Sequence, residues 1–580
     1  MTDTVRILGI EGTAWAASAA VFDAETDDVF IETDAYQPES GGIHPREAAE
    51  HMHDAIPRVV ERALEHARET HDGHATEASV DVDERGSSGQ QAAPVDAVAF
   101  SRGPGLGPCL RVVGTAARAL SQALEVPLIG VNHMVAHLEI GRHTSGFDSP
   151  VCLNASGANA HLLAYRNGRY RVLGETMDTG VGNAIDKFTR HVGWSHPGGP
   201  KVEAAAKDGE YVDLPYVVKG MDFSFSGIMS AAKQAYDGVS ASSASGGSSD
   251  ERRESGGGVP VEDVCYSLQE NVFGMLTEVS ERALSLTGSD ELVLGGGVGQ
   301  NARFREMLTE MCAQRGAEFH APEPRFLRDN AGMIAVLGAK MYEAGDTLAL
   351  EDSRVDPDFR PDQVSVTWRS DEPELAAGRS VSAAADEQVR GAEALVTLEP
   401  DAGRVTKRRE TKTYRHPELD ERLRRERTTL EARLTSLARR EGVPTPVLSD
   451  VDSREARLEL EYVGDRDLRE GLTPERVRDV GRHLAGLHRA GFVHGDPTTR
   501  NIRLAPERTY LIDFGLGYHT DHVEDYAMDL HVFDQSLVGT ADDPEPLREA
   551  VRDGYREVGE ERVLERLRDV EGRGRYQSDA

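Results

Sequence analysis

Lysine is nearly absent from this 580-residue chain: only 8 of its 65 basic residues are lysine, and the rest are arginine. Positive charge is scarce as a whole, because 100 acidic residues leave a formal net charge of −35. A surface crowded with carboxylates and almost free of lysine is typical of a protein kept soluble in a salt-saturated cytoplasm, as in halophilic archaea. The alternative is a generally acidic protein from a low-salt cell, which the arginine bias disfavours.

Cysteine is scarce too, and the four present, at positions 109, 152, 265 and 312, show no Cys-x-x-Cys spacing. This excludes a disulfide framework and a thiolate zinc site, so we expect four small core residues. No run of eighteen apolar residues occurs, and a strand is predicted at once, at residues 5–10. We therefore expect a soluble, cytoplasmic protein that has no membrane partner.

The length of the chain predicts more than one domain. Residues 71–94 and 237–260 are rich in serine, glycine and acids and poor in aliphatic residues, which is typical of surface insertions. Residues 346–385 combine prolines with charges, and we predict a linker there. The linker would separate a first domain, residues 1–345, from a second domain, residues 386–580.

The first domain alternates short apolar strands with amphipathic stretches of helix length, which predicts an α/β fold. It also repeats itself, since residues 5–36 and 151–177 each read as strand, small-residue loop, strand, turn and strand. Backbone amides in such loops can approach phosphates because no side chain blocks them. A duplicated hairpin module of this kind resembles the actin-like ATPase superfamily (ASKHA), which implies a two-lobed domain around a nucleotide.

A third glycine loop follows the predicted strand at residues 292–294 and precedes a predicted helix at 302–315. The N-terminus of a helix after a glycine turn is suited to hold a nucleotide. A lone glycine run would be uninformative, but as the third loop of a duplicated fold it supports the same interpretation.

Two histidines, His133 and His137, follow a predicted strand at residues 127–131. If the segment is helical, the i, i+4 spacing puts both imidazoles on one face, where they can chelate one divalent ion. Asp329 is our candidate for the third ligand, because a turn that opens a helix can direct its carboxylate inward. The alternative is that the histidines only cap or pack the helix.

A metallopeptidase is the obvious rival for such a histidine pair. The zincin pattern needs a glutamate between its histidines as general base, whereas Met134, Val135 and Ala136 stand there. We therefore rank a peptidase low.

The second domain contains His494-Gly495-Asp496 with Asn501 five residues after the aspartate, and then Asp513-Phe514-Gly515. This order and spacing match the catalytic loop and metal-binding turn of protein kinases. We expect Asp496 to orient the attacking hydroxyl and Asn501 with Asp513 to hold Mg²⁺ on ATP. The alternative is two turns that happen to contain acids.

Lys407, on a predicted strand, is the candidate for the lysine that pairs with the phosphates. Its ion-pair partner is expected to be Glu431, with Glu426 as the alternative. No Gly-x-Gly-x-x-Gly loop precedes this lysine, and no Ala-Pro-Glu follows Asp513. The positions of the phosphate loop are taken instead by Gly391, Ala392, Glu393 and Ala394. The pattern predicts a minimal protein-kinase-like α+β domain.

The second domain resembles the small atypical kinase of the KEOPS complex. The resemblance is carried by residues 391–394, 414–420, 427–433 and 573–576. It implies a regulatory ATPase and autokinase that uses ATP and magnesium in support of tRNA modification.

The first domain, outside its two insertions, resembles the KEOPS threonylcarbamoyltransferase family. The matching segments are residues 9–11, 101–107, 132–133, 183–188, 196–203, 223–227, 295–297 and 329–330. The resemblance implies that His133, His137 and Asp329 hold one metal ion, preferably iron, with zinc as the alternative. It further implies a threonylcarbamoyl-AMP site made of Asn154, Ala155, Ser156, Gly157, Ala158, Asp186, Gly199, Glu203 and Asn301.

One position departs from the family pattern, because Asn154 stands where archaeal relatives place a metal-binding tyrosine. An amide oxygen is a weaker donor than a phenolate. The fourth metal ligand could therefore be Asn154, a water or the substrate.

Together these resemblances imply transfer of a threonylcarbamoyl group to the N6 amine of the adenosine beside the anticodon in ANN-decoding tRNAs. The expected partners are tRNA and other KEOPS subunits. The candidate tRNA contacts are the arginines at residues 404–409, 415, 422–427, 439–440 and 573–575. The alternatives are a signalling serine/threonine kinase on an inactive actin-like scaffold, and the metallopeptidase.

Overall fold

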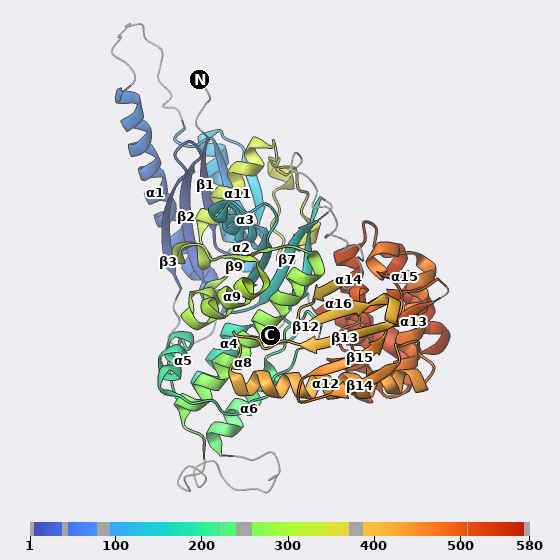
Figure 1. The fold of residues 1–580 in the computed structure, drawn as a ribbon. Coiled ribbons are helices and arrows are strands. Elements are labelled where there is room, and N and C mark those ends of the chain that lie inside the picture. The colour runs from blue at the N-terminus through green and yellow to red at the C-terminus, as the bar shows by residue number, and fades with distance from the viewer. Residues whose placement is uncertain are drawn as a thin grey trace, which may run out of the picture.

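Two five-stranded sheets with the same topology form the centre of the N-terminal unit (Figure 1). The computed structural model describes residues 5–36, 44–77, 93–166, 168–218, 220–238, 258–369, 387–506 and 508–573. The first sheet has the order β3 (Asp28–Ala35), β2 (Ala16–Asp23), β1 (Arg6–Glu11), β4 (Ala97–Gly103), β5 (Leu128–Asn132). The second has the order β8 (Arg169–Glu175), β7 (Ala160–Arg166), β6 (Val151–Ala155), β9 (Glu291–Gly295), β10 (Glu318–His320).

The pairing of the strands confirms the predicted duplication. β1 is antiparallel to β2 and parallel to β4, and in the second sheet β6 is antiparallel to β7 and parallel to β9. All residues of β1 and β6 are buried, as expected for central strands that are covered on both faces. This duplicated topology is that of the actin-like ATPase fold.

Helices cover both faces of each sheet. α1 (Pro45–Glu77) and α2 (Gly107–Leu124) pack on the outer face of the first sheet. α3 (His133–Ser145) and α11 (Ala331–Glu343) lie between the two sheets and share one apolar core with them. The remaining helices of the unit are α4 (Val181–His191), α5 (Gly199–Ala205), α6 (Ser226–Asp237), α8 (Val261–Thr287), α9 (Ala302–Arg315) and α10 (Pro324–Leu327).

The packing of α11 on β1 is unusually close. A Cβ atom on Gly9 would lie 2.5 Å from the backbone oxygen of Ala331, so only glycine fits where the helix begins. This approach brings the residues just before α11 next to the end of β1 and the start of α3. Three segments far apart in the sequence therefore meet between the sheets.

Residues 346–369 pack on the N-terminal unit, although we predicted a linker from residue 346 onward. Leu348 pairs with Leu128, the backbone oxygen of Phe359 accepts a hydrogen bond from Asn132, and the Arg369 guanidinium lies 3.8 Å from the ring centre of Tyr165. The remainder of the predicted linker, residues 370–385, lies outside the described residues, as do residues 78–92 and 239–257 of the two predicted insertions.

The C-terminal unit begins with an antiparallel sheet. Its order is β11 (Glu387–Arg390), β12 (Ala394–Glu399), β13 (Arg404–Arg409), β15 (Arg457–Glu461), β14 (Leu448–Asp452), with α12 (Pro417–Arg440) packed against it. A helical part follows, made of α13 (Pro474–Arg489), α14 (Val523–Thr540), α15 (Glu545–Val558) and α16 (Glu561–Arg573). Five short strands connect the parts: β16 (Arg466–Asp467), β17 (Phe492–Val493), β18 (Ile502–Leu504), β19 (Thr509–Leu511) and β20 (Tyr518–His519). No helix in the described ranges is long and apolar enough to cross a membrane.

Helix α8 joins the two units, and Figure 1 shows it in green beside the orange strands of the C-terminal sheet. Glu278 of this helix accepts hydrogen bonds from Arg427 at 3.0 Å and Arg415 at 2.6 Å, both from the C-terminal unit. It also pairs with Arg282 of its own helix at 3.0 Å. All four side chains are less than 10% exposed. Buried charges need such partners, so this network is a main determinant of how the units dock.

We expect the substitution Glu278→Ala to lower the free energy of unfolding by about 3–5 kcal/mol, because three buried guanidiniums lose a carboxylate. Chemical denaturation followed by circular dichroism measures the change. Glu306→Ala is the matched control, since Glu306 also pairs with an arginine, at 2.7 Å, but is 59% exposed. Its loss should cost less than about 1 kcal/mol. Equal effects in the two variants would contradict the role of the buried network.

Candidate metal and nucleotide sites

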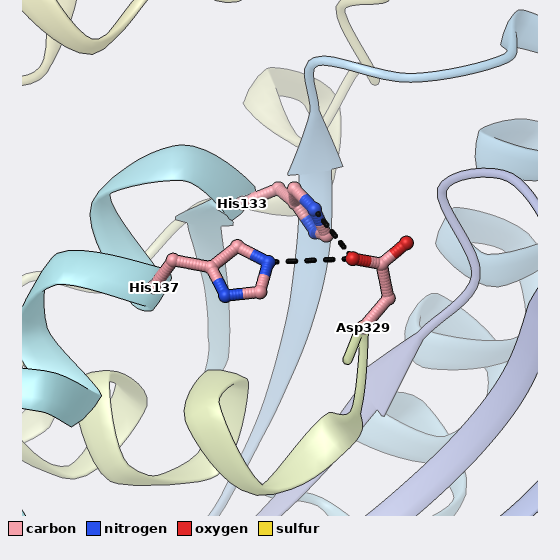
Figure 2. Close-up of side chains that lie close together, drawn as sticks. All are labelled: His133, His137 and Asp329. Atoms are coloured by element: carbon pink, nitrogen blue, oxygen red, sulfur yellow. Dashed lines mark hydrogen bonds and ion pairs between the residues drawn. The ribbon is translucent and has the colours of Figure 1, made fainter. Parts of the chain in front are cut away.

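His133, His137 and Asp329 converge between the two sheets, as Figure 2 shows. His133 is the first residue of α3, which begins there because the Oδ1 atom of Asn132 accepts from two backbone amides. His137 follows one turn later on the same face. Asp329 precedes α11, and its Oδ1 atom lies 3.3 Å from Nε2 of each imidazole. The predicted helical spacing of the histidines is present, and the carboxylate faces both rings.

Two further side chains hold this group in place. The Oε2 atom of Glu11, at the end of β1, lies 3.1 Å from Nδ1 of His133. The indole Nε1 of Trp15 donates to the Oδ2 atom of Asp329 at 2.9 Å. The sequence marked Glu11 only as part of a family segment and did not mark Trp15. The one local signal for Glu11 is that a carboxylate stands at the end of a predicted strand. Its partner, His133, is 122 residues away in the sequence, so no short-range pattern links the two.

The electrostatics of the site favour a bound cation. Burial alone would lower the pKa of His133, but the charges of Glu11 and Asp329 outweigh it and raise that pKa to about 10. Burial lowers the pKa of His137, and repulsion from His133 acts in the same direction. Burial opposes ionisation of Asp329, yet the two imidazoles hold its pKa far below the usual range. The carboxylates of Glu11 and Asp329 thus both favour positive charge on His133.

The donor set fits a divalent metal. One ligand atom from each of the three residues lies within 4.8 Å of the others, and within the described part of the chain they form the one such group of histidine, cysteine or acidic residues. Metal-binding histidines commonly have their second ring nitrogen held by a carboxylate, as Glu11 holds His133. The residues present therefore suit the ion that the resemblance implies.

Asn154 lies beside this group. It pairs in register with Gly295 of β9, and a Cβ on Gly295 would be 3.4 Å from Asn154 Oδ1 and 3.5 Å from the Cβ of His137. The Oδ1 atom is buried and has no hydrogen-bond partner among the residues described. Gly296 has a φ of +85°, and a Cβ there would lie 2.2 Å from the backbone oxygen of Ala155, so the turn after β9 requires glycine.

The predicted nucleotide residues form a chain of contacts from α4 to α9. The backbone oxygen of Gly157 accepts from Asn183 N in α4 at 2.9 Å. Asp186 of α4 accepts from Gly198 N at 2.7 Å, just before Gly199 starts α5. Helix α5 carries Glu203, which contacts the start of α9.

Glu203 accepts from the backbone amide of Ala302 at 2.9 Å, at the start of α9. Asn301 caps this helix through a hydrogen bond from Phe304 N at 3.0 Å and donates to Gln269 of α8 at 3.1 Å. The loop of residues 155–158, Asp186, Gly199, Glu203 and Asn301 are thus linked through neighbouring helices. Gln269 was not predicted, because its contact depends on the packing of α8.

In the C-terminal unit, Lys407 donates to both carboxylate oxygens of Glu431, at 2.9 and 3.0 Å, and lies 2.7 Å from Asp513 Oδ1. Glu426, the alternative partner, is on the exposed face of α12. Burial opposes ionisation of Asp513, but Lys407 and Arg409 lower its pKa to about 2. Asn501 donates to the carboxylate of Asp496 at 3.1 Å.

The turn of residues 391–394 is held by the N-terminal unit. Arg282 of α8 donates to Glu393 at 3.0 Å, and Arg315 of α9 donates to the backbone oxygen of Gly391 at 3.4 Å. The backbone oxygen of Ala392 accepts from Lys412, and Ala394 begins β12. The four residues predicted at the phosphate-loop position therefore face the seam between the units.

Arg282 also forms an ion pair with Asp496, at 3.1 Å between Nη1 and Oδ2. This arginine was missed, since nothing in the sequence of a buried helix marks one arginine as reaching a carboxylate 214 residues further on. Burial favours neutral Asp496 and raises its pKa, while the charge of Arg282 acts against that rise.

Three arginines among the candidate tRNA contacts are buried and do not lie on the surface. Arg409, Arg415 and Arg427 are only 3%, 5% and 6% exposed and bind Glu431 or Glu278. Their prediction as tRNA contacts is corrected, because arginine-rich sequence does not show which guanidiniums face buried acids. Residues 574 and 575 lie outside the described part of the chain.

We expect His137→Ala to abolish retention of a divalent cation, and Glu11→Gln to weaken metal affinity by about 10- to 100-fold through loss of the contact that orients His133. Elemental analysis after dialysis and competition with a chelating dye measure both effects. His143→Ala is the control, because His143 lies on the same helix but pairs with exposed Asp27. An equal loss of metal in the control would contradict the assignment.

Comparisons with known proteins span the whole chain. Residues 84–336 match the family described as "TsaD: tRNA N6-adenosine threonylcarbamoyltransferase". A "Probable bifunctional tRNA threonylcarbamoyladenosine biosynthesis protein" of Haloarcula marismortui is 65% identical over 99% of this chain and 100% of its own length. Proteins with the same description are 65% identical in Halobacterium salinarum, over 99% of both chains, and 46% identical in Methanosarcina acetivorans, over 98% of this chain and 99% of its own. The chain therefore belongs to the family of bifunctional tRNA threonylcarbamoyladenosine biosynthesis proteins.

Proposed function

We propose that this chain transfers the threonylcarbamoyl group from threonylcarbamoyl-AMP to the N6 amine of the adenosine next to the anticodon in ANN-decoding tRNAs, as part of a cytoplasmic KEOPS complex. The observation that carries the proposal is the convergence of His133, His137 and Asp329 beside Asn154 and the glycine turn after β9. The match to a threonylcarbamoyltransferase family covers all of these residues.

The metal site is proposed to hold iron, with zinc as the alternative, because two imidazoles and one carboxylate suit both ions. When bound, the metal would supply Lewis-acid polarisation of the carbamoyl carbonyl. Glu11 orients His133 so that its Nε2 atom faces Asp329. Asn154 is the proposed fourth donor, since its buried Oδ1 atom has no hydrogen-bond partner in the described ranges.

The adenylate is proposed to lie along the loop of residues 155–158, Asp186, Gly199, Glu203 and Asn301. The space beside Gly199 supports this, because a Cβ there would meet no atom within 4 Å. The backbone amide of Gly199, where α5 begins, can donate to an anion, whereas the amide of Ala302 already donates to Glu203. In the reaction the amine nitrogen bonds to the carbamoyl carbon, the bond from that carbon to the phosphate oxygen breaks, and AMP leaves with the electron pair. The amine loses one proton, which passes to the leaving phosphate or to water.

The C-terminal unit is proposed to be a minimal kinase-like ATPase and autokinase. Lys407 with its partner Glu431 would hold the ATP phosphates, and Asn501 with Asp513 would hold Mg²⁺. Asp496 would orient the attacking group. In the docked structure, however, that carboxylate is paired with Arg282, which reduces its ability to accept a proton from a hydroxyl.

This ion pair favours a regulatory role over the signalling kinase. A kinase that phosphorylates other proteins needs its catalytic aspartate to meet a protein hydroxyl, and here that position adjoins α8 of the N-terminal unit. The exposed arginines of α12, including Arg425 and Arg440, remain as proposed tRNA contacts. The peptidase is disfavoured by the residues between His133 and His137, none of which is acidic.

Nucleoside mass spectrometry of tRNA tests the transferase proposal. In cells that carry His133→Ala as the sole copy, we expect threonylcarbamoyladenosine to fall below about 1% of wild type, since the site loses a metal ligand. His143→Ala, on the same helix, should keep normal levels. Wild-type levels in the His133→Ala cells would overturn the proposal.

ATP hydrolysis by the purified full-length chain tests the role of Arg282. We expect Arg282→Met to raise the rate about tenfold, which corresponds to release of about 1.4 kcal/mol of interaction with Asp496. Arg303→Met is the control, because Arg303 joins the two units through Glu270 and the backbone oxygen of Tyr414 without touching Asp496 or residues 391–394. The gain should vanish in Arg282→Met combined with Asp496→Asn. A rate that is unchanged or lower in Arg282→Met alone would contradict the proposed restraint.

A further inference from the structure

A small cavity lies in the seam between the units, and none of the residues that line it belongs to either proposed catalytic site. It is formed by the ends of strands β6, β7 and β8, the end of helix α8, and Gly539 of α14. Its volume is about 20 Å³. Roughly 10–15 Å³ is enough for one water-sized particle, so the cavity holds a single small ion or one to two waters.

Two arginines line this cavity, Arg166 and Arg171, and no lining residue is acidic. The polar residues beside them already use their hydroxyls, because Thr287 donates to the backbone oxygen of Ala283 and Ser289 donates to the backbone oxygen of Ser149. The cavity is therefore positively charged in a chain whose net charge is strongly negative.

Arg171 is the decisive residue. Arg171 is only 7% exposed, and its Nε atom is buried without a hydrogen-bond partner. Among the residues that the structure describes, the side chain of Arg171 forms no hydrogen bond and no ion pair. An unpaired guanidinium at this depth costs several kcal/mol, which a bound anion would offset.

The neighbouring arginines do not relieve this excess of charge. Arg500 donates to Ser285 at the end of α8, and Arg469 donates to Asp467 and lies within reach of the backbone oxygen of Leu286. These two arginines thus take up the carbonyl groups at the end of α8. Arg166 has one contact of this kind, a hydrogen bond of 3.1 Å to the backbone oxygen of Gly539.

The pKa directions agree with this distribution of charge. Burial lowers the pKa of Arg171, and the charges of Arg169 and Arg166 lower it further, while Asp362 and Asp542 act weakly against that change. Burial also lowers the pKa of Arg166. The charge of Asp542 raises that pKa, and the charge of Arg469 lowers it further. Burial and Arg469 lower the pKa of Arg500 to about 10. Each arginine here is less well compensated than one on the surface.

We propose that this cavity binds one monoatomic anion, of the size and charge of chloride, between Arg166 and Arg171. The volume excludes sulfate or phosphate with their larger shells of oxygen atoms, while a halide fits a space for one or two waters. A cytoplasm rich in salt, as the composition indicates, would keep the site filled. Because Arg166 also binds Gly539 of the C-terminal unit, the anion would stabilise the docked arrangement.

Thermal unfolding of the full-length chain tests this proposal. Potassium is held constant while chloride is replaced stepwise by gluconate, an anion too large for the cavity. We expect the melting temperature of the wild type to rise by about 2 °C as chloride saturates, by mass action on the folded state. Arg171→Met should lose this dependence, and Arg454→Met, which removes an exposed arginine from a distant turn, should keep it.

The same comparison separates an anion site from a merely unpaired charge. If the cavity stays empty, Arg171→Met should be more stable than the wild type by the same margin in chloride and in gluconate, and the proposal is then overturned. Sulfate that replaces chloride as the saturating ligand would overturn the assignment to a monoatomic anion.

A crystal of the wild-type chain grown in bromide gives a readout that does not depend on any variant folding. We expect an anomalous peak between the guanidiniums of Arg166 and Arg171. Its absence, in crystals that show bromide elsewhere, would overturn the proposal.

Discussion

Helix α8 carries Glu278, Glu281 and Arg282 into the interior of the molecule, where charges are stable only when they are paired. Their partners come largely from the C-terminal unit, through Arg415, Arg427 and other residues. Because an unpaired buried charge is costly, these pairs favour the docked arrangement of the two units over others. The docked arrangement in turn decides what the kinase-like carboxylates face, and it creates the cavity with Arg171. A few buried ion pairs thus determine both the assembly and the environment of two sites.

Local patterns were sufficient for much of the fold and for the metal ligands. The repeated strand and loop order predicted the duplicated sheets, and the i, i+4 spacing of His133 and His137 predicted a shared helix face. Asp329 was reached through the turn before a helix and through family resemblance. Glu11 and Trp15 were not assigned, because their contacts arise only when the end of β1 packs between α3 and α11. Sequence spacing carries no information about such tertiary contacts.

Charge was the property that sequence reasoning handled least well. Arginine-rich segments suggested nucleic-acid contacts, yet Arg415 and Arg427 are buried on acids of a helix more than 130 residues away. Prolines and charges suggested a free linker, yet two aromatic residues, Phe359 and Trp368, help anchor residues 346–369 in the core between the sheets. In both cases composition described an average, while a few individual side chains determined the outcome. By contrast, Lys407 and Glu431 were correctly paired, because the strand and the buried face of α12 were both predictable.

Gln269 touches the helix cap formed by Asn301, and Arg282, thirteen residues further along the same helix, touches Asp496. At a rise of about 1.5 Å per residue, a single helical segment of about 20 Å therefore contributes to both proposed sites. A chimera that exchanges one half of the molecule would therefore have to keep the contacts at both ends of this segment, Gln269 with Asn301 and Arg282 with Asp496.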